Sequence, residues 1–333
     1  MSTVHAVAAF DGLPISHPDA LVDVEVPVPE LRPRDLLVRV RAVSVNPVDV
    51  KVRSGLERRD TPKVLGWDAA GTVEAVGPQV EGFGVGDEVW YAGDLTRPGS
   101  NTELHAVDER VVSRKPTTLG FAEAAALPLT TITAWESLFD RLRLTGSSRG
   151  DLLVLGAAGG VGSVLVQLAK LRTGLRVLAG AGKAESREWV TALGADAVVD
   201  HHDLVASVRA QAPDGVDLLF SPHSTGNVEA FAEVLKPFGE VVAIDDPVGL
   251  DLYPLKTKSI TWHWELMFTR PMFTTPDVAE QGRLLAETAS LVDAGHLRST
   301  LTTAIDDFSA AGLREAHRLV ETGRTVGKVV VHR

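Results

Sequence analysis

The sequence predicts an α/β protein in which a β-rich N-terminal region is followed by a doubly wound parallel sheet. From about residue 150 onward, short apolar runs and helical patterns alternate strictly, which is typical of parallel strands covered by helices on both faces. Glycines stand directly after the first of these apolar runs, where a strand would turn into a helix. At 333 residues the chain is long enough for two domains with sizeable buried cores.

The first 120 residues are rich in Val, Pro and Gly and indicate an irregular all-β region. Short alternating runs at residues 36–45 and 71–77 are separated there by turn residues. From about Leu119 the spacing becomes helical, with Pro128 as an interruption.

The alternating part predicts strands at residues 152–156, 176–180, 197–200, 216–221 and 240–245. Helices are expected between them, at residues 163–173, 185–193, 203–212 and 227–236. Two further helical patterns follow, at residues 278–295 and 309–323, before a closing strand at residues 328–332.

The composition excludes several classes of function. Lys plus Arg at 33 against Asp plus Glu at 44 gives a net charge of −11, which argues against a nucleic-acid partner. No apolar stretch is long enough to cross a membrane and the start lacks a secretory signal, so we expect a cytoplasmic protein without a membrane partner. The chain has no cysteine, which excludes disulfides, thiolate zinc sites and a cysteine nucleophile.

A glycine turn at residues 156–162 is the strongest sign of a binding site. In the order strand, glycine turn, helix, glycines let the backbone approach a pyrophosphate that the helix N-terminus then binds. Gly159 and Gly162 match the second and third glycines of the dinucleotide fingerprint, while Ala157 replaces the first. With Gly160 and Val161 they predict a dinucleotide site; an ordinary tight turn is the alternative.

The end of the second strand of this region predicts the coenzyme. NAD-specific proteins carry an acid there, but this chain has Ala181, followed by Gly182 and Lys183. These residues and Arg187 favour NADPH, whose 2′-phosphate the two cations would approach. Lys183 and Arg187 could instead be ordinary surface residues, and Glu185, the contrary signal, is expected to face solvent.

Several motifs together resemble the medium-chain dehydrogenase/reductase superfamily, and more narrowly its zinc-independent quinone oxidoreductase branch. They are VSVNPVDVKVRSG, VLGWDAAGTVEAVG, GDEVWYAG, ALPLTTITAWESL and GAAGGVGSVLVQLAK; residues 255–273 are similar to zinc-type alcohol dehydrogenase-like proteins. The resemblance implies a GroES-like β domain, residues 1–122 and 268–333, and a Rossmann domain, residues 123–267, with the coenzyme in a cleft.

The same resemblance argues against a metal. Where zinc-dependent relatives place a Cys and a His-Glu pair, this chain has Asn46 and the sequence Gly66-Trp67-Asp68. Trp67 cannot ligate zinc and no thiolate is available. Without a metal Lewis acid, reduction of an activated acceptor is easier than oxidation of a simple alcohol.

The resemblance singles out Asn46, Asp49 and Tyr91 as candidate catalytic residues. Asn46 could orient the nicotinamide or the acceptor oxygen, or merely start a turn before Pro47. Asp49 could hydrogen-bond to Asn46, or serve as a structural ion-pair partner of nearby cations. Tyr91 could donate a proton to a reduced oxygen, or be a half-buried core tyrosine.

Further coenzyme contacts are expected from the segments that pass the nicotinamide in this family. Thr130 and Thr133 could contact the coenzyme or bond back to helical carbonyls. Ser221 and His223 follow the fourth strand, at the edge of the sheet where dinucleotides bind. His223 could act as a proton donor or be a hydrogen-bonded loop residue. After the fifth strand, Ile244 and Asp245 should lie near the nicotinamide ribose.

An aromatic cluster, Trp262, Trp264, Phe268 and Phe273, is expected at an edge strand that pairs two copies into a homodimer, with part of it lining the pocket. The leading prediction is an NADPH-dependent oxidoreductase for a quinone or α,β-unsaturated carbonyl. The alternatives are a non-catalytic NADPH-binding structural or redox-sensing protein, and an alcohol dehydrogenase or lyase.

Overall fold

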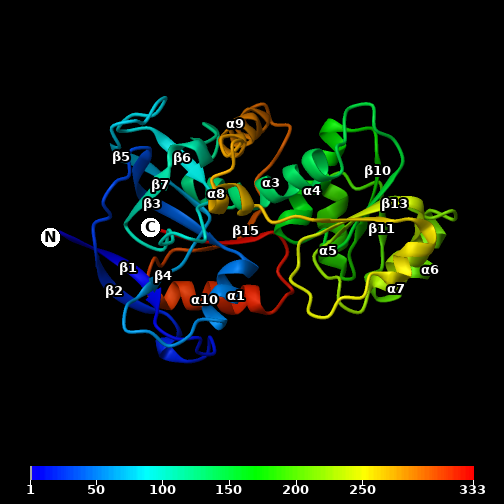
Figure 1. Ribbon diagram of the computed structural model, residues 1–333, viewed down its shortest axis with the longest axis horizontal. Coiled ribbons are helices and arrows are strands. Elements are labelled where there is room, and N and C mark those ends of the chain that lie inside the picture. The colour runs from blue at the N-terminus through cyan, green and yellow to red at the C-terminus, as the bar shows by residue number, and fades with distance from the viewer. Residues whose placement is uncertain (1) are drawn as a thin grey trace. The chain divides into compact units, whose positions relative to one another are not determined.

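The computed structural model describes residues 2–333 and divides the chain into two compact units. Unit 1 extends from the N-terminus to Ile132 and resumes at Phe268–Arg333; unit 2 is the continuous segment Thr133–Met267. Figure 1 shows that the blue-to-cyan and the orange-to-red parts of the chain together form unit 1. The domain bounds expected from the resemblance, residues 1–122 with 268–333 and residues 123–267, stay a prediction; in the structure residues 123–132 pack with unit 1.

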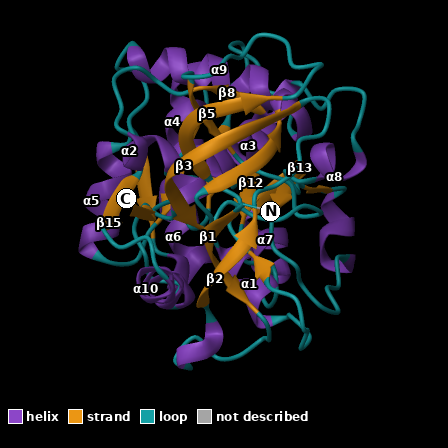
Figure 2. Cartoon of the chain, turned by 90° about the vertical axis from the view of Figure 1, so that its left-hand side faces the viewer, coloured by secondary structure: helices purple, strands orange, loops and turns teal. Residues whose placement is uncertain are grey.

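Unit 1 is built on a mainly antiparallel seven-stranded sheet. Its order is β15-β16-β3-β5-β6-β8, with β7 also paired to β3, and only β15 and β16 run parallel. Figure 2 labels β3, β5, β8 and β15 of this sheet. The bounds are β3 Asp35–Val45, β5 Ala69–Val76, β6 Glu88–Tyr91, β7 Leu104–Asp108, β8 Val112–Arg114, β15 Leu301–Ile305 and β16 Lys328–His332. A smaller sheet, β2-β1-β4, consists of β1 Thr3–Ala9, β2 Val22–Pro27 and β4 Lys63–Val64.

One helix of unit 1 was not predicted. Helix α1, Pro47–Ser54, interrupts the region that we expected to be all β. Asn46 is its N-cap and Pro47 its first residue, a combination that also starts turns and therefore reads ambiguously in the sequence. The remaining helices of unit 1 are α2 Phe121–Ala125, α3 Pro128–Trp135 (which continues into unit 2), α8 Thr269–Phe273, α9 Glu280–Asp293 and α10 Ala310–Glu321.

Unit 2 has the predicted doubly wound parallel sheet (Figure 1). Its six strands, all paired in parallel, follow the order β11-β10-β9-β12-β13-β14, the Rossmann arrangement. The successive residues Leu152, Leu153 and Val154 of β9 are all buried, so helices cover both faces of the sheet. The strands are β9 Asp151–Val154, β10 Arg176–Gly180, β11 Ala197–Val199, β12 Val216–Ser221, β13 Leu235–Ala243 and β14 Thr261–Trp264. The helices are α4 Gly160–Arg172, α5 Ala184–Ala192, α6 Leu204–Gln211 and α7 Val228–Val234.

Two local predictions need correction. The helical segment after Leu119 is three pieces, because α2 and α3 are separated before Pro128 and α3 continues as the π-helix Glu136–Arg141. Helix α7 ends at Val234, and β13 already begins at Leu235, five residues before the predicted strand.

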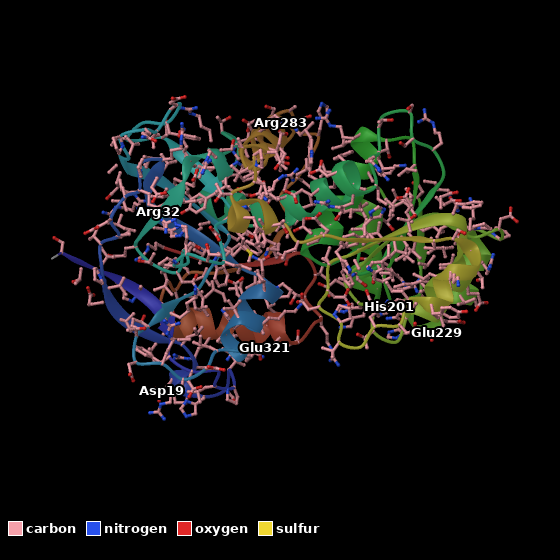
Figure 3. All side chains as sticks on the ribbon, viewed as in Figure 1. Asp19, Arg32, His201, Glu229, Arg283 and Glu321 are labelled. Atoms are coloured by element: carbon pink, nitrogen blue, oxygen red, sulfur yellow. The ribbon has the colours of Figure 1, made fainter. Side chains whose placement is uncertain are left out.

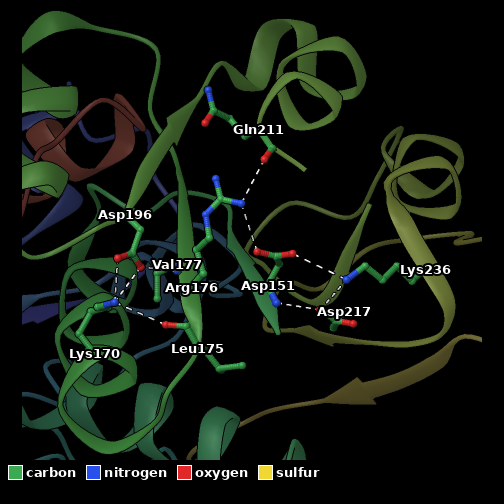
Figure 4. Close-up of polar contacts among 9 residues, drawn as sticks. All are labelled: Asp151, Lys170, Leu175, Arg176, Val177, Asp196, Gln211, Asp217 and Lys236. Carbon is green, nitrogen blue, oxygen red and sulfur yellow. Dashed lines mark hydrogen bonds and ion pairs between the residues drawn. The ribbon is translucent and has the colours of Figure 1, made fainter. Parts of the chain in front are cut away.

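Polar contacts hold the amino ends of the strands in unit 2. Lys236 Nζ lies 2.9 Å from Asp217 Oδ2 and 3.7 Å from Asp151 Oδ2, and Arg176 Nη1 lies 3.4 Å from Asp151 Oδ1 (Figure 4). These residues stand at or near the beginnings of β13, β12, β9 and β10. The ion pairs therefore lie at the edge of the sheet opposite the glycine turn.

Across residues 2–333, every helix falls short of the length and hydropathy that a bilayer-spanning segment requires.

Candidate functional site

The glycine turn between β9 and α4 has the geometry of a phosphate cradle. Gly156 has a left-handed φ of +61°, and Gly159 is the N-cap of α4. A methyl group on Gly162 would lie only 2.4 Å from the carbonyl oxygen of Gly156, so the helix can approach the strand this closely only with glycine there. Gly160 and Val161 open the first turn, where backbone N–H groups have no partner in their own helix. The four predicted residues thus lie together at the carboxyl edge of the sheet.

The end of β10 carries no carboxylate of its own, and imidazoles lie close to Gly182. Ala181 is buried, and its N–H donates to the carbonyl of Val199 on the neighbouring strand. A methyl group on Gly182 would lie 2.9 Å from His201 Cε1 and 3.4 Å from His202 Nε2. The two imidazoles therefore occupy the space beside Gly182 (His201 is labelled in Figure 3).

Lys183 and Arg187, the two predicted cations, lie at the N-terminal end of helix α5. Lys183 is its exposed N-cap. Arg187 Nε donates to the carbonyl of Gly182 at 3.4 Å, while Nη2 lies 3.8 Å from Asp200 Oδ2. Glu185 is exposed in the first turn, as predicted.

The sequence analysis did not identify Asp200, His201 and His202 as neighbours of the loop that joins β10 to α5. Within residues 2–333 they are the one group of three His or acidic side chains whose ligand-type atoms lie within 4.8 Å of one another. The available signal was position: the segment follows β11, which pairs with β10, so their carboxyl ends must be adjacent.

The ends of β12 and β13 are tied together. Ile244 N–H donates to the carbonyl of Ser221, and His223 N–H donates to Ser221 Oγ at 3.0 Å. Asp245 accepts from Ser224 Oγ at 2.7 Å and from Ser224 N–H at 2.6 Å. All four predicted residues, Ser221, His223, Ile244 and Asp245, thus share this sheet edge, and the His223 side chain is exposed there.

Asn46 belongs to a buried polar network in unit 1. Its Nδ2 donates to Asp68 Oδ2 at 3.2 Å and to the carbonyl of Ser44 at 3.3 Å. Its Oδ1 accepts from Lys328 Nζ at 2.5 Å. Because both amide hydrogens are engaged, the remaining capacity of this side chain is one lone pair of Oδ1. The Asn46 side chain can therefore accept from a ligand; the residue occupies the N-cap position of α1 without a side-chain hydrogen bond to that helix.

Burial controls the charges of this network. It raises the pKa of Asp68 to about 6, against the opposing effects of the Lys328 ammonium and the donors Asn46 and Leu129. Burial likewise raises the pKa of Asp49 to about 7, although Asp49 Oδ2 accepts from Asn46 N–H at 2.7 Å. Asp49 Oδ1 is buried without a hydrogen-bond partner. A proton on this carboxyl group is therefore exchangeable near neutral pH.

Tyr91 and Thr130 match the structural alternatives of the prediction. Tyr91 is fully buried, with its hydroxyl 3.0 Å from His105 Nδ1, while His105 Nε2 lies 3.0 Å from the carbonyl of Pro98. Nε2 must donate to that carbonyl, so Nδ1 accepts the Tyr91 proton. Thr130 Oγ1 bonds back to the helical carbonyl of Leu127 at 2.9 Å. Thr133 is buried in the same helix.

The aromatic residues do not form one cluster. Trp262 and Trp264 lie on β14 with ring centroids 5.5 Å apart, and Trp264 is 51% exposed. Phe268 belongs to unit 1, where it is buried edge-on against Trp67. Phe273, at the end of α8, is 74% exposed.

The residues around Asn46 do not fit a zinc ion. Trp67 is fully buried, and its indole N–H donates to the carbonyl of Asp94 at 3.0 Å. The Lys328 ammonium lies 2.5 Å from Asn46 Oδ1 and 3.5 Å from Asp68 Oδ2. A cation already bonded to these oxygens, in a chain without thiolates, leaves no donor set of the kind that zinc requires.

Comparison with known proteins identifies the family. Residues 32–134 match the alcohol dehydrogenase GroES-like domain, and residues 193–331 match the zinc-binding dehydrogenase family. A zinc-type alcohol dehydrogenase-like protein of Staphylococcus aureus (strain MSSA476) is 39% identical over 308 residues, covering 90% of each chain. The NADPH-dependent alkenal/one oxidoreductase of Arabidopsis thaliana is 32% identical, covering 93% of this chain and 75% of the plant protein.

Among solved structures, a protein from Rhizobium etli CFN 42 is 47% identical with a TM-score of 0.95, covering 100% of this chain and 99% of its own. The GroES-like fold of unit 1, the Rossmann fold of unit 2 and these relatives all indicate the same family. The chain is an oxidoreductase of the medium-chain dehydrogenase/reductase superfamily.

Proposed function

We propose that this protein is an NADPH-dependent reductase of quinones or α,β-unsaturated carbonyls that works without a metal. The observation that carries the coenzyme assignment is the loop after β10. It combines Gly182 with Lys183, Arg187 and a pair of imidazoles, where an NAD-specific protein has an acid at the strand end. The nearby carboxylate, Asp200, already faces Arg187.

The glycine turn fits the coenzyme pyrophosphate, since Gly162 keeps the α4 N-terminus close to β9. Bound there, the coenzyme would supply a hydride. The residues of this chain would bind and orient the coenzyme and the acceptor, and would hold or release a proton. Ser221 and Ile244, at the ends of β12 and β13, would border the nicotinamide half.

An activated acceptor suits the polar groups of unit 1. A quinone or enone delocalises the developing charge onto its own oxygen, so alignment matters more than a Lewis acid. The remaining Asn46 Oδ1 lone pair would accept from an N–H group of the bound coenzyme, since a quinone or enone carbonyl can itself only accept. Asp49, whose pKa burial raises to about 7, would hold and release the proton at Oδ1. The similarity to an alkenal/one oxidoreductase supports the same acceptor class.

The test is to mix purified protein with NADPH or NADH and a panel of quinones, enones, aldehydes and alcohols, and to follow nicotinamide absorbance. The proposal expects consumption of NADPH with quinones or enones. Tight NADPH binding with no consumption across the panel would instead favour a structural or redox-sensing role. Turnover with simple alcohols alone would favour an alcohol dehydrogenase.

We also propose a homodimer that forms through β14. This strand is the last in the order of the unit 2 sheet and exposes half of Trp264. Pairing two such edges by a two-fold axis would continue the sheet across both copies. Light scattering should give twice the 35.5 kDa chain mass, and Trp264→Glu should shift it toward the monomer.

A further inference from the structure

Lys328, the first residue of β16, carries an ammonium group that is almost completely removed from solvent. The side chain is 4% exposed. Nζ lies 3.1 Å from the carbonyl oxygen of Val45, 2.5 Å from Asn46 Oδ1 and 3.5 Å from Asp68 Oδ2. An ammonium has three N–H donors and no acceptor, so these three oxygens can use its whole hydrogen-bonding capacity. The function proposed above gives this group no task.

The contacts of Lys328 leave the Asn46 amide one favourable orientation. Oδ1 faces a group that can only donate, whereas Nδ2 faces the Asp68 carboxylate and the carbonyl of Ser44, which can only accept. A rotation of the amide by 180° would set Nδ2 against the ammonium and Oδ1 against the carboxylate. Both contacts would then become repulsive.

Asp68 holds the ammonium in place and is itself fixed from two sides. Its Oδ1 accepts from the backbone N–H of Leu129 at 3.2 Å, and its Oδ2 accepts from Asn46. The side chain of Asp68 is fully buried, so its contacts with Lys328 are not weakened by solvent. The network as a whole therefore fixes the direction of the second lone pair of Asn46 Oδ1.

We propose that Lys328 is a positioning residue for the reduction: it locks the Asn46 amide so that Oδ1 is presented to an N–H donor of the bound coenzyme. The proposal rests on the proposed function, in which Asn46 orients the reacting groups. Lys328 touches neither coenzyme nor acceptor in this role.

Two charge-neutral double variants isolate the role of Lys328. Removing Lys328 alone would leave Asp68 as an unpaired buried charge and destabilise unit 1, whereas replacing both partners of a buried ion pair is often close to neutral for stability. K328M/D68N removes both charges and the donor to Oδ1. K328Q/D68N removes the same charges but keeps an amide donor at residue 328.

With NADPH and a good quinone, K328M/D68N should lower kcat by about tenfold while KM for NADPH stays within about twofold. K328Q/D68N should recover most of that loss, because the donor is restored. In an N46A background, K328M/D68N should lower kcat no further, since both changes act through one side chain. R97M/D35N, which removes the other buried ion pair of unit 1, should retain the parental kcat.

Parental kcat in K328M/D68N, or the same loss in both double variants, overturns the role of Lys328. Slow turnover of N46A together with fast turnover of K328M/D68N removes this inference and leaves the proposed function standing. Parental turnover of N46A removes this inference together with the role of Asn46, whereas no consumption of NADPH by the unaltered protein with any quinone or enone removes the proposed function. A neutron structure of the unaltered protein provides a test that needs no variant: it should show Oδ1 of Asn46 facing Lys328, and an Nδ2 deuteron directed at Lys328 would refute the locked orientation.

Discussion

Arg187 Nη2 lies 3.8 Å from Asp200 Oδ2, so the guanidinium that we assign to the coenzyme phosphate faces a carboxylate of the adjacent strand end. Both side chains are about two-fifths exposed, at 42% and 41%. Solvent screens a pair this exposed, so it contributes little to stability. A bound 2′-phosphate would therefore compete with Asp200 for Arg187 at a small energetic cost.

This relationship predicts opposite effects of two changes. Lys183→Ala with Arg187→Ala should lower the ratio of kcat/KM for NADPH to that for NADH by about ten- to a hundredfold, the equivalent of roughly 1.5 to 3 kcal/mol for a charge-assisted contact. Asp200→Asn should raise the same ratio by up to about fivefold, because the competing carboxylate is gone. Glu185→Gln, on the exposed first turn of the same helix, is the matched control and should leave the ratio unchanged. Equal kcat/KM with both coenzymes in the parent, or an unaltered ratio in the double variant, would show that the loop after β10 does not bind the 2′-phosphate.

Asn46→Ala should lower turnover by about tenfold, equivalent to about 1.4 kcal/mol in the barrier, because the one free acceptor of the network is lost. The same change removes the partner of Lys328 and should also lower the thermal midpoint by a few degrees. Steady-state kinetics and a melting curve separate the two effects. If turnover of the variant stays within about twofold of the parent, Asn46 has no role in turnover and is only the N-cap residue of α1.

Activity should be independent of zinc, since the oxygens around Asn46 are already bonded to the Lys328 ammonium. Dialysis against a strong chelator should leave kcat/KM unchanged, and elemental analysis of active protein should find no stoichiometric zinc. A zinc ion that copurifies and is needed for turnover would overturn the metal-free mechanism.

The glycine turn between β9 and α4 predicts that one added methyl group strongly weakens coenzyme binding. In Gly162→Ala the new carbon would collide with the backbone of Gly156 and Ala157, at 2.4 and 2.6 Å, so the turn must open. Fluorescence titration should show NADPH binding weakened by at least about tenfold. Gly84→Ala meets no neighbouring atom and, like Gly162, has no positive φ, so it controls for the loss of a glycine without a steric clash. Parental affinity in Gly162→Ala would refute the close approach.

His317 on α10 predicts a loss of stability in mild acid. Burial, with a smaller contribution from Arg53, lowers the pKa of His317 to about 3, and both ring nitrogens lack a hydrogen-bond partner. Between about pH 6.5 and pH 3 the unfolded chain therefore binds a proton that the folded chain does not, so stability falls as the pH falls through this range. Asp49 acts in the opposite direction, because its pKa is raised to about 7 and its contribution is lost as the pH rises from about 4 to 7.

The comparison of the parent with His317→Leu cancels the Asp49 effect. Urea unfolding should show the parent losing about 1 to 2 kcal/mol relative to the variant between pH 7 and pH 5. Arg53, which acts on His317, and its partner Glu321 are present in both proteins, so their effects cancel as well (Glu321 is labelled in Figure 3). A difference that does not vary with pH would show that His317 is protonated in the folded state.

The sequence was sufficient for the Rossmann unit because its signals are local. Strand, glycine turn and helix follow one another along the chain, and the period of the apolar residues distinguishes strands from helices. The buried network around Asn46 was not readable in the same way. Asp68 and Lys328 lie far from Asn46 along the chain, and a lysine at the start of a strand normally indicates a solvated end. Helix α1 was missed because Asn46-Pro47 starts helices and turns alike.

The 282 positions that separate Asn46 from Lys328 have a consequence for biosynthesis. Strand β3 and the segment carrying Asp68 leave the ribosome long before β16 is made, and until then no ammonium is available for the Asp68 carboxylate. Burying that carboxylate alone would cost several kcal/mol. Unit 2 is one continuous stretch, residues 133–267, and can fold as soon as it has been translated. The unit that begins the polypeptide is thus the one that completes its folding last.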